Sequence, residues 1–248
     1  MDDTDPAAPA DEVREHGPPS SLPDPAFAEV LESAAQLQRL IPDAVLVGGS
    51  AAAFYVHHRL SFDHDHVLSR LQEQFDAVLE AVEAEGDWVT NRVTYGKIIL
   101  GSIGGIEAGV RQLIRRTPLE VAEVELPSGA VLRVPTIDET LRIKAFLAVK
   151  RNQVRDYLDI AALSDRVGLE HAADVLSAMD QYYADQHAAG EGVSSQVARQ
   201  LAEPRPRDSS VIGQLDSYKG LRPEWQQWSR VVGVCQDVAS LMVEKAGP

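Results

Sequence analysis

The stretch Val45–Val67, VLVGGSAAAFYVHHRLSFDHDHV, constrains the fold of this chain more than any other part of its sequence. A short apolar run before Gly48 predicts a strand. Gly48, Gly49 and Ser50 predict a tight turn, with Ser50 as the N-cap of a helix over residues 51–58. The run SFDHDHV predicts a second strand after that helix. This order of strand, turn, helix and strand indicates an α+β unit.

Asp63 and Asp65 stand two residues apart in the second predicted strand. Side chains at i and i+2 of a strand point to the same face, so these carboxylates lie side by side while His64 and His66 face the other way. Adjacent carboxylates repel each other unless a positive charge lies near them. Mg²⁺ is commonly held by one or two carboxylates together with substrate phosphates. The pair therefore predicts a magnesium site, with Mn²⁺ as an alternative ion.

Other interpretations of these residues stay open from the sequence. Gly49 and Ser50 suit a turn whose free N–H groups bind a triphosphate, but a strand–helix junction also favours small residues. The two aspartates are also compatible with solvated carboxylates at a sheet edge. The histidines nearby, including His57 and His58, suggest a zinc or manganese site as a competing hypothesis, because imidazole is a common ligand of transition metals.

A second informative segment covers residues 135–159. Thr136 and Glu139 form a capping-box pattern at the start of a predicted helix. Lys144 and Arg151 fall on one face of that helix, and a cation facing a triphosphate stabilises the charge that develops in phosphoryl transfer. Asp156 follows near the start of the next helix, where an acidic residue complements the helix dipole. A solvated basic helix face is the alternative for the cations.

The Gly-Ser turn, the helix and the Asp-x-Asp strand, followed by a Lys helix and Arg-Asp-Tyr-x-Asp, resemble the nucleotidyltransferase superfamily that shares the fold of DNA polymerase beta. Within it the chain looks like the AbiEii/AbiGii toxin family. The resemblance implies transfer of NMP from an NTP to an acceptor hydroxyl. It also implies RNA, with the tRNA 3′ end as candidate acceptor, and a cognate antitoxin as partner. The implied catalytic residues are Asp63, Asp65, Lys144 and Asp156, the nucleotide-binding residues Gly49, Ser50, Lys144 and Arg151, and the metal ligands Asp63 and Asp65.

One position departs from the superfamily pattern. Such enzymes place a third carboxylate on a strand beside the Asp-x-Asp strand, but the corresponding run, residues 106–114, has Arg111 and Gln112 in the most similar positions. Glu107 is the acid in that strand. The alternative function is therefore a nucleotidyltransferase-fold binding or interaction module that has lost catalysis.

The rest of the chain sets the domain boundaries and excludes some classes. We expect a small mixed β-sheet with packed helices, followed by a helical C-terminal region. The expected parts are a disordered acidic tail 1–24, a nucleotidyltransferase core 25–134, a helical region 135–187 completing the site, a linker 188–210 and a C-terminal helix within 211–248. The net charge of −15 argues against non-specific nucleic-acid binding. The single Cys235 and the lack of a long apolar run favour a cytoplasmic protein without membrane association.

Overall fold

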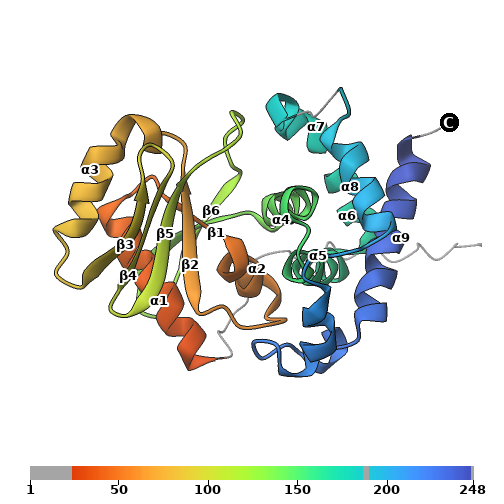
Figure 1. Ribbon diagram of the computed structural model, residues 1–248, viewed down its shortest axis with the longest axis horizontal. Helices are drawn as coiled ribbons and strands as arrows, with labels where there is room; N and C mark the ends of the chain where they lie inside the picture. Colours follow the sequence, from red (N-terminus) through yellow and green to blue (C-terminus); the bar gives the residue numbers. More distant parts are fainter. Residues whose placement is uncertain (1–23, 187–189, 247–248) are drawn as a thin grey trace, which may run out of the picture.

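The computed structural model describes residues 24–186 and 190–246, so the predicted tail over residues 1–24 lies outside the described part apart from Asp24. In Figure 1 a half that contains the main sheet lies beside a half made of C-terminal helices. The strands are β1 Val45–Val47, β2 Asp63–Leu68, β3 Trp88–Thr94, β4 Ile98–Ile103, β5 Ile106–Gln112, β6 Val121–Glu125 and β7 Val131–Pro135. The α-helices are α1 Pro25–Leu40, α2 Gly48–Val56, α3 Leu71–Glu83, α4 Ile137–Arg151, α5 Val154–Val167, α6 Leu169–Ser177, α7 Met179–Tyr182, α8 Val193–Ala202 and α9 Trp228–Ala246.

The main sheet has the strand order β1-β2-β5-β4-β3. β2 and β5 run parallel, and the other neighbouring pairs are antiparallel. β6 and β7 form a separate antiparallel pair. The predicted α+β class with a small mixed sheet and packed helices is confirmed.

Burial alternates along β2 with a period of two residues. His64 and His66 are buried, whereas Asp63 and Asp65 are half-buried. Helices α1 and α3 pack on the histidine face and form a hydrophobic cluster with it. Members of this cluster include Leu37, Ile41, Leu68, Leu71, Phe75, Val78, Ile99 and Val110. Because that face is filled, the aspartates must project from the opposite face, as the strand alternation predicts.

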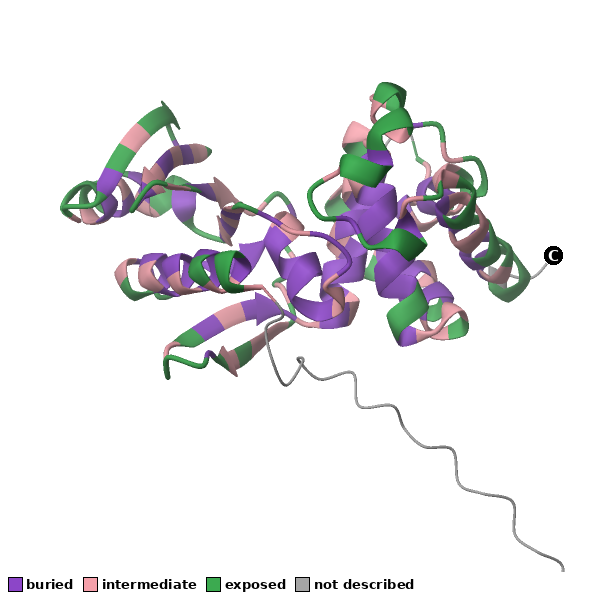
Figure 2. Ribbon diagram, turned by 90° about the horizontal axis from the view of Figure 1, so that it is seen from below, coloured by how far each residue is buried: buried purple, intermediate pink, exposed green. Residues whose placement is uncertain are grey.

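A second and larger core joins the two halves of the molecule. It contains α2 residues such as Phe54 and apolar residues of α4, α5, α6, α8 and α9. In Figure 2 the buried residues gather in the central helices, between the sheet and the outer C-terminal helices. The helix predicted to start at Thr136 does so: the Thr136 hydroxyl accepts a hydrogen bond from the Glu139 N–H at 3.2 Å. This cap fixes the start of α4, which carries Lys144.

Residues 188–210, expected as a linker, include the ordered helix α8. Val193, Val197 and Leu201 recur at four-residue spacing and are buried in the larger core. The Gly, Ser and Pro content of the flanking residues suggested a linker, but this apolar stripe gives the segment a reason to fold. Across residues 24–186 and 190–246, no helix combines the length and the apolar character that a bilayer span requires.

Candidate active site

Asp63 and Asp65 lie next to each other on the half-buried face of β2. Asp63 Oδ1 accepts a hydrogen bond from the Ser61 hydroxyl at 3.0 Å. Asp65 Oδ1 accepts one from Arg111 Nε at 3.1 Å, and both side chains of this ion pair are about one-third exposed. Neither carboxylate is sealed from solvent, so both remain accessible to an ion or a substrate. Two accessible carboxylates on one face match the donor set that Mg²⁺ uses when substrate phosphates complete its coordination.

The Gly-Gly-Ser turn lies directly against this carboxylate pair. Gly48 has a φ of +79°, a conformation that favours glycine. A Cβ on Gly49 would lie 2.8 Å from both Arg59 Nη2 and Ser61 Oγ, so only glycine allows these side chains to approach the turn. The buried Ser50 hydroxyl donates to the main-chain carbonyl of Asp63. Ser50 therefore ties the turn to the start of β2.

The helix after this turn begins earlier than the sequence predicts. Its first residue is Gly48, and its N-cap is Val47, which has no side-chain hydrogen bond to the helix. The prediction that Ser50 is the N-cap was wrong, because the Ser50 hydroxyl bonds to Asp63 instead. The N-terminus of α2 thus carries backbone N–H groups without a side-chain cap, beside Asp65.

Lys144 lies in a buried network centred on Asp159. Lys144 Nζ is 2.7 Å from Asp159 Oδ2. Asp159 also accepts hydrogen bonds from Arg59, at 2.8 Å to Nε and 3.0 Å to Nη2, and pairs with His58 Nε2 at 2.7 Å. Burial by itself raises the pKa of Asp159, but Arg59, Lys144 and His58 outweigh it and lower that pKa well below the usual value. Burial lowers the pKa of Lys144, against the opposing effect of Asp159.

Asp156 orients Arg151. Arg151 Nε donates to Asp156 Oδ2 at 2.8 Å, and Arg151 Nη2 donates to Oδ1 at 2.6 Å. Asp156 is fully buried, while the Arg151 side chain is one-third exposed. Burial lowers the pKa of Arg151, but the hydrogen bonds that it donates to Asp156 more than compensate and raise that pKa. A bidentate pair of this kind fixes the direction of the guanidinium toward the aspartates of β2.

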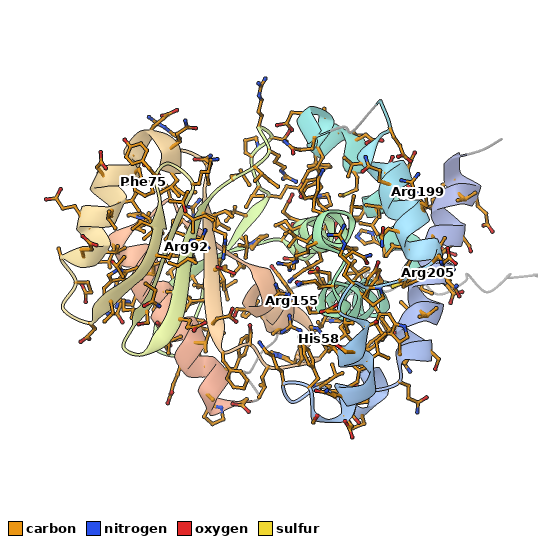
Figure 3. All side chains as sticks on the ribbon, in the orientation of Figure 1. His58, Phe75, Arg92, Arg155, Arg199 and Arg205 are labelled. Carbon is orange, nitrogen blue, oxygen red and sulfur yellow. The ribbon has the colours of Figure 1, made fainter. Side chains whose placement is uncertain are left out.

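Residues from both sequence segments meet at one narrow cavity of about 30 Å³, which we call the basic pocket. It is lined by Gly49, Arg59, Ser61, Asp63, Asp65, Lys144, Arg151, Arg155 and Lys219. Figure 3 labels His58 and Arg155 in this region, where the sheet half meets the helical half. Two of the predicted site residues, Ser50 and Asp156, do not line the pocket. Ser50 is hydrogen-bonded to the main chain of Asp63, and Asp156 is hydrogen-bonded to Arg151, so each positions a residue that does. The predicted site residues did not include Arg59, Arg155, Asp159 and Lys219, although the first three lie within the two informative segments.

A wider cleft of about 400 Å³ opens from the same aspartates. It shares Asp63, Asp65, Arg151 and Arg155 with the basic pocket. Its other walls are mostly apolar side chains from α4 and the segment after β5, among them Leu113, Ile114, Leu119, Ile143, Phe146 and Leu147. A charged end joined to an apolar chamber suits an anionic ligand that carries a ring system.

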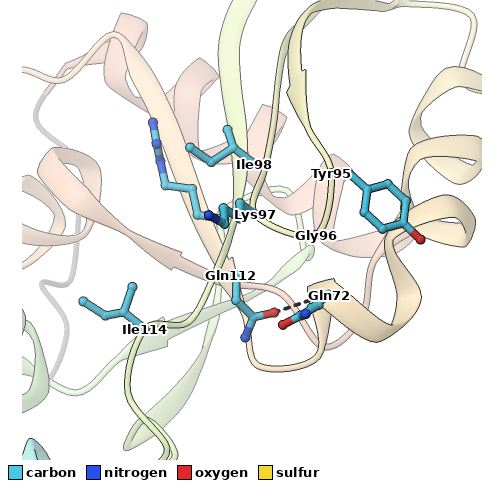
Figure 4. Close-up of a pocket in the computed structure, with 8 residues that line it drawn as sticks. Gln72, Tyr95, Gly96, Lys97, Ile98, Gln112 and Ile114 are labelled. Atoms are coloured by element: carbon cyan, nitrogen blue, oxygen red, sulfur yellow. Dashed lines mark hydrogen bonds between the residues drawn. The ribbon is translucent and has the colours of Figure 1, made fainter. Parts of the chain in front are cut away.

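Two further cavities touch Arg111. One, of about 190 Å³, lies over β5, β4 and β3 and includes Asp63, Asp65 and Glu107. The other, of about 490 Å³, is shown in Figure 4 and lies at the far end of the sheet. In Figure 4 the dashed line joins Gln72 and Gln112, whose main-chain N–H and side-chain oxygen are 2.9 Å apart. This larger cavity has neither aspartate in its wall, so its volume does not make it the candidate site.

The place of a third carboxylate can be read from the strand register. Glu107 pairs with Asp63, and Gly109 pairs with Asp65. A Cβ on Gly109 would lie 2.5 Å from Asp65 Oδ1, so this position has no room for a side chain. Glu107 shares the face of Asp63 but is exposed. Within the described residues, no three His, Cys, Asp or Glu side chains are grouped closely enough to hold a metal ion.

The histidines do not form the competing metal site in the described part of the chain. His64 and His66 pack edge to face, with ring centroids 5.3 Å apart, on the face of β2 opposite the aspartates. His64 Nε2 lies 3.0 Å from the Ser33 hydroxyl of α1. Burial lowers the pKa of His64 to about 4 and that of His66 well below the usual value. Both imidazoles are therefore neutral packing groups near pH 7.

No family model matches the sequence. A crystal structure described as a putative nucleotidyltransferase from H. pylori is similar to this chain, with a TM-score of 0.50 and 16% identity, covering 90% of this chain and 97% of that one. The antibiotic-resistance factor ANT(2'')-Ia superposes over 64% of this chain and 93% of its own, at 13% identity and a TM-score of 0.45.

Curated relatives are found among mycobacterial proteins. The heme uptake protein MmpL11 of Mycobacterium tuberculosis is 32% identical over 233 residues, covering 88% of this chain and 23% of that protein. The mycolic acid-containing lipids exporter MmpL11 of Mycolicibacterium smegmatis is 36% identical over 132 residues, covering 53% of this chain and 13% of that protein. The chain thus spans less than a quarter of the length of these relatives. The H. pylori structure shows that the chain has a nucleotidyltransferase fold.

Proposed function

We propose that the chain is a Mg²⁺-dependent nucleotidyltransferase that transfers NMP from an NTP to an acceptor hydroxyl. The observation that carries the proposal is the basic pocket. Gly49, Asp63 and Asp65 come from one sequence segment, Lys144 and Arg151 come from another segment far along the chain, and all five line the same cavity. Carboxylates and cations placed together in this way suit a metal-bound polyphosphate.

Each group then has a defined task. Asp63 and Asp65 would hold Mg²⁺, which when bound draws charge from the phosphoryl oxygens. Arg151, held by Asp156, faces the cavity and stabilises negative charge on the leaving phosphates. Lys144 and Arg59 share the single carboxylate of Asp159, so together they leave a net positive charge in the wall of the pocket. In the reaction the acceptor hydroxyl loses its proton to solvent, its oxygen bonds to the α-phosphorus, the bond from that phosphorus to the β-bridging oxygen breaks, and pyrophosphate leaves.

The shapes of the two connected cavities support a direction for the nucleotide. The cations of the basic pocket would face the distal phosphates at its mouth, since the pocket itself has a volume of only about 30 Å³. The base and the ribose fit the mostly apolar cleft beside α4, which continues from the same aspartates. The acceptor hydroxyl then approaches from the cavity over β5 and β4, where the exposed Glu107 is the nearest carboxylate in register with Asp63.

The finer parts of the proposal rest on the resemblance to the AbiEii/AbiGii toxins. They are a toxin-like role, RNA with the tRNA 3′ end as acceptor, a cognate antitoxin, and action in the cytoplasm. A chain with a net charge of −15 attracts RNA only through a local surface, to which the partly exposed Arg151, Arg155 and Lys219 would contribute.

The test combines purified protein, Mg²⁺, each α-labelled NTP in turn and total bacterial RNA. We expect label in RNA with the native chain and none with Asp63→Asn/Asp65→Asn, which keeps the shape of both side chains and removes their charge. Asp237→Asn, at an exposed position on α9, is the matched control. Equal labelling by the native chain and the double variant would overturn the proposal.

A second candidate function is a nucleotide-binding or interaction module without catalysis. Two observations favour it: Arg111 pairs with Asp65, and the sequence relatives contain this region as a minor part of proteins named for heme uptake or lipid export. Such a module would work by reporting nucleotide binding to a partner. It predicts Mg²⁺-dependent NTP binding that needs Asp65 but releases no pyrophosphate with any acceptor.

A further inference from the structure

Residues 208–222, here called the C-terminal strap, cross the loop that leads into β2. The strap contains the 3-10 segment Ser209–Ser217 and lies between α8 and α9 in the chain. Two backbone hydrogen bonds join the strap to the 57–62 loop. The Leu60 N–H donates to the Lys219 carbonyl, and the Arg222 N–H donates to the His58 carbonyl, each at 2.8 Å. The strap is thereby fixed to the segment that carries Arg59 and Ser61.

The strap is also anchored to the helical half. The Asp208 carboxylate accepts a hydrogen bond from the Val154 N–H at 2.8 Å, at the start of α5. Leu215 and Leu221 are buried in the larger core. The strap is therefore held against α5 as well as against the loop before β2.

Lys219 has an unusual backbone conformation in this strap. Its φ is +44°, in the left-handed region that residues other than Gly and Asn seldom adopt. Strain of this kind persists where the surrounding structure holds it and is concentrated at functional sites. Here the main-chain bond to Leu60 holds the residue, and the exposed side chain lines the basic pocket.

The charges around the basic pocket are not equally compensated. Arg59 and Lys144 pair with Asp159, and Arg151 pairs with Asp156. The half-buried Arg155 donates from Nε to the neutral Gln153 side chain at 3.0 Å. In the described ranges, no carboxylate forms an ion pair with Arg155.

Lys219 likewise has no ion-pair partner among the described carboxylates. The two cations come from different parts of the chain, α5 and the strap, and meet at one cavity. Arg155 also lines the cleft of about 400 Å³, so these two unpaired cations are available to a polyanion that extends from that cleft.

We propose that Lys219 and Arg155 form a polyphosphate-binding clamp, in which the strap delivers Lys219 over the distal phosphates of the substrate. The identity of the substrate as an NTP rests on the proposed function, whereas the clamp itself requires only a chain of linked phosphates. Lys219 is a binding residue in this account, and the strap is the element that completes the site.

The test measures binding of inorganic tripolyphosphate and of AMP by isothermal titration calorimetry, for the native chain, Lys219→Gly, Lys219→Ala and Lys219→Arg. Glycine relieves the backbone strain while alanine keeps it, and both remove the cation. We expect both to weaken tripolyphosphate binding at least about tenfold, the range for losing one charged hydrogen bond. Lys219→Arg should stay within a few-fold of the native chain, and AMP affinity should not change.

Lys245→Ala is the control for loss of a lysine, since Lys245 lies at the far end of α9 and pairs with Asp174. Thermal melting separates folding from binding: Lys219→Gly should melt no lower than the native chain. Tripolyphosphate affinity that is unchanged in both Lys219→Gly and Lys219→Ala would overturn the clamp, as would a native chain that binds no tripolyphosphate.

The outcomes distinguish this inference from the proposed function. Tripolyphosphate binding that depends on Lys219, without NMP transfer to any acceptor, would leave the clamp standing and refute the transferase. NMP transfer with the same NTP KM in the native chain and Lys219→Gly would leave the transferase standing and refute the clamp.

Discussion

Replacing Asp159 with asparagine tests the buried charge network behind the basic pocket. Asp159 is fully buried and holds Arg59 and Lys144, which are themselves almost fully buried. The asparagine side chain would keep the shape but leave two buried cations without a counter-charge. Removing one partner of a buried ion pair costs about 3–5 kcal/mol. That is a large share of a typical free energy of unfolding of about 5–15 kcal/mol.

Urea denaturation and thermal melting, each followed by tryptophan fluorescence, measure this loss. For a chain of this size each kcal/mol corresponds to about 2–4 °C, so the melting temperature should fall by roughly 6–20 °C. The control Asp165→Asn breaks an exposed pair with Arg230, at 3.5 Å, and should change stability by less than about 0.5 kcal/mol. The double variant Asp159→Asn/Lys144→Met should recover part of the loss, because one uncompensated charge is gone. A loss below about 1 kcal/mol for Asp159→Asn would refute the network.

Three further predictions follow from particular contacts. Burial lowers the pKa of His64 from 6.5 to about 4 in the folded chain, so between these pH values the unfolded chain binds a proton that the folded chain does not. His64 should therefore lower the free energy of unfolding by about 3 kcal/mol as the pH falls from about 6.5 to 4. Chemical denaturation should show a weaker acid dependence for His64→Gln than for the native chain, and an identical one would contradict the assignment. Gly109→Ala should lower the free energy of unfolding by about 1–3 kcal/mol and impair Mg²⁺ binding, because the new Cβ would collide with Asp65. Gly213→Ala, with open space around it, should do neither, and equal melting curves for the two variants would refute the collision. Arg111→Gln should raise the affinity for Mn²⁺ in the absence of nucleotide, because the substitution removes the guanidinium that pairs with Asp65. Electron paramagnetic resonance measures this affinity, and a lower value would argue that Arg111 supports the metal site.

The parts of the site that follow from local periodicity were predictable from the sequence. Asp63 and Asp65 share the open face of β2 while His64 is buried beneath it, because strand side chains alternate and one face is filled by α1 and α3. The Thr136 cap was predictable for a similar reason, since a capping box lies within four residues. These features need no knowledge of distant contacts.

The partners that lie far apart in the sequence were not predictable. Asp159 appeared only as the last letter of a motif, yet it holds Arg59 across 100 residues. Lys219 lies beyond the resemblance, in a segment whose position depends on packing of the whole helical half. Sequence periodicity reports which face of an element is apolar, but it carries no information on which elements meet.

The prediction for the start of α2 failed for a different reason. Ser50 has the residue type of an N-cap, but the competing bond to the Asp63 carbonyl uses its hydroxyl, and the helix begins at Gly48. The preference of serine for N-cap positions reflects hydrogen bonds within the helix start, whereas the Ser50 hydroxyl makes a tertiary hydrogen bond instead. The same bond is what ties the glycine turn to the carboxylates.

Pyrophosphate release with each NTP, Mg²⁺ and RNA decides whether Asp63 and Asp65 support nucleotidyl transfer. It should be measured for the native chain, Asp63→Asn/Asp65→Asn and the exposed control Asp237→Asn. We expect release that needs both Mg²⁺ and RNA, is lost in the double variant and is kept in Asp237→Asn. Release that persists in the double variant, or none from the native chain with any NTP, would contradict nucleotidyl transfer at Asp63 and Asp65.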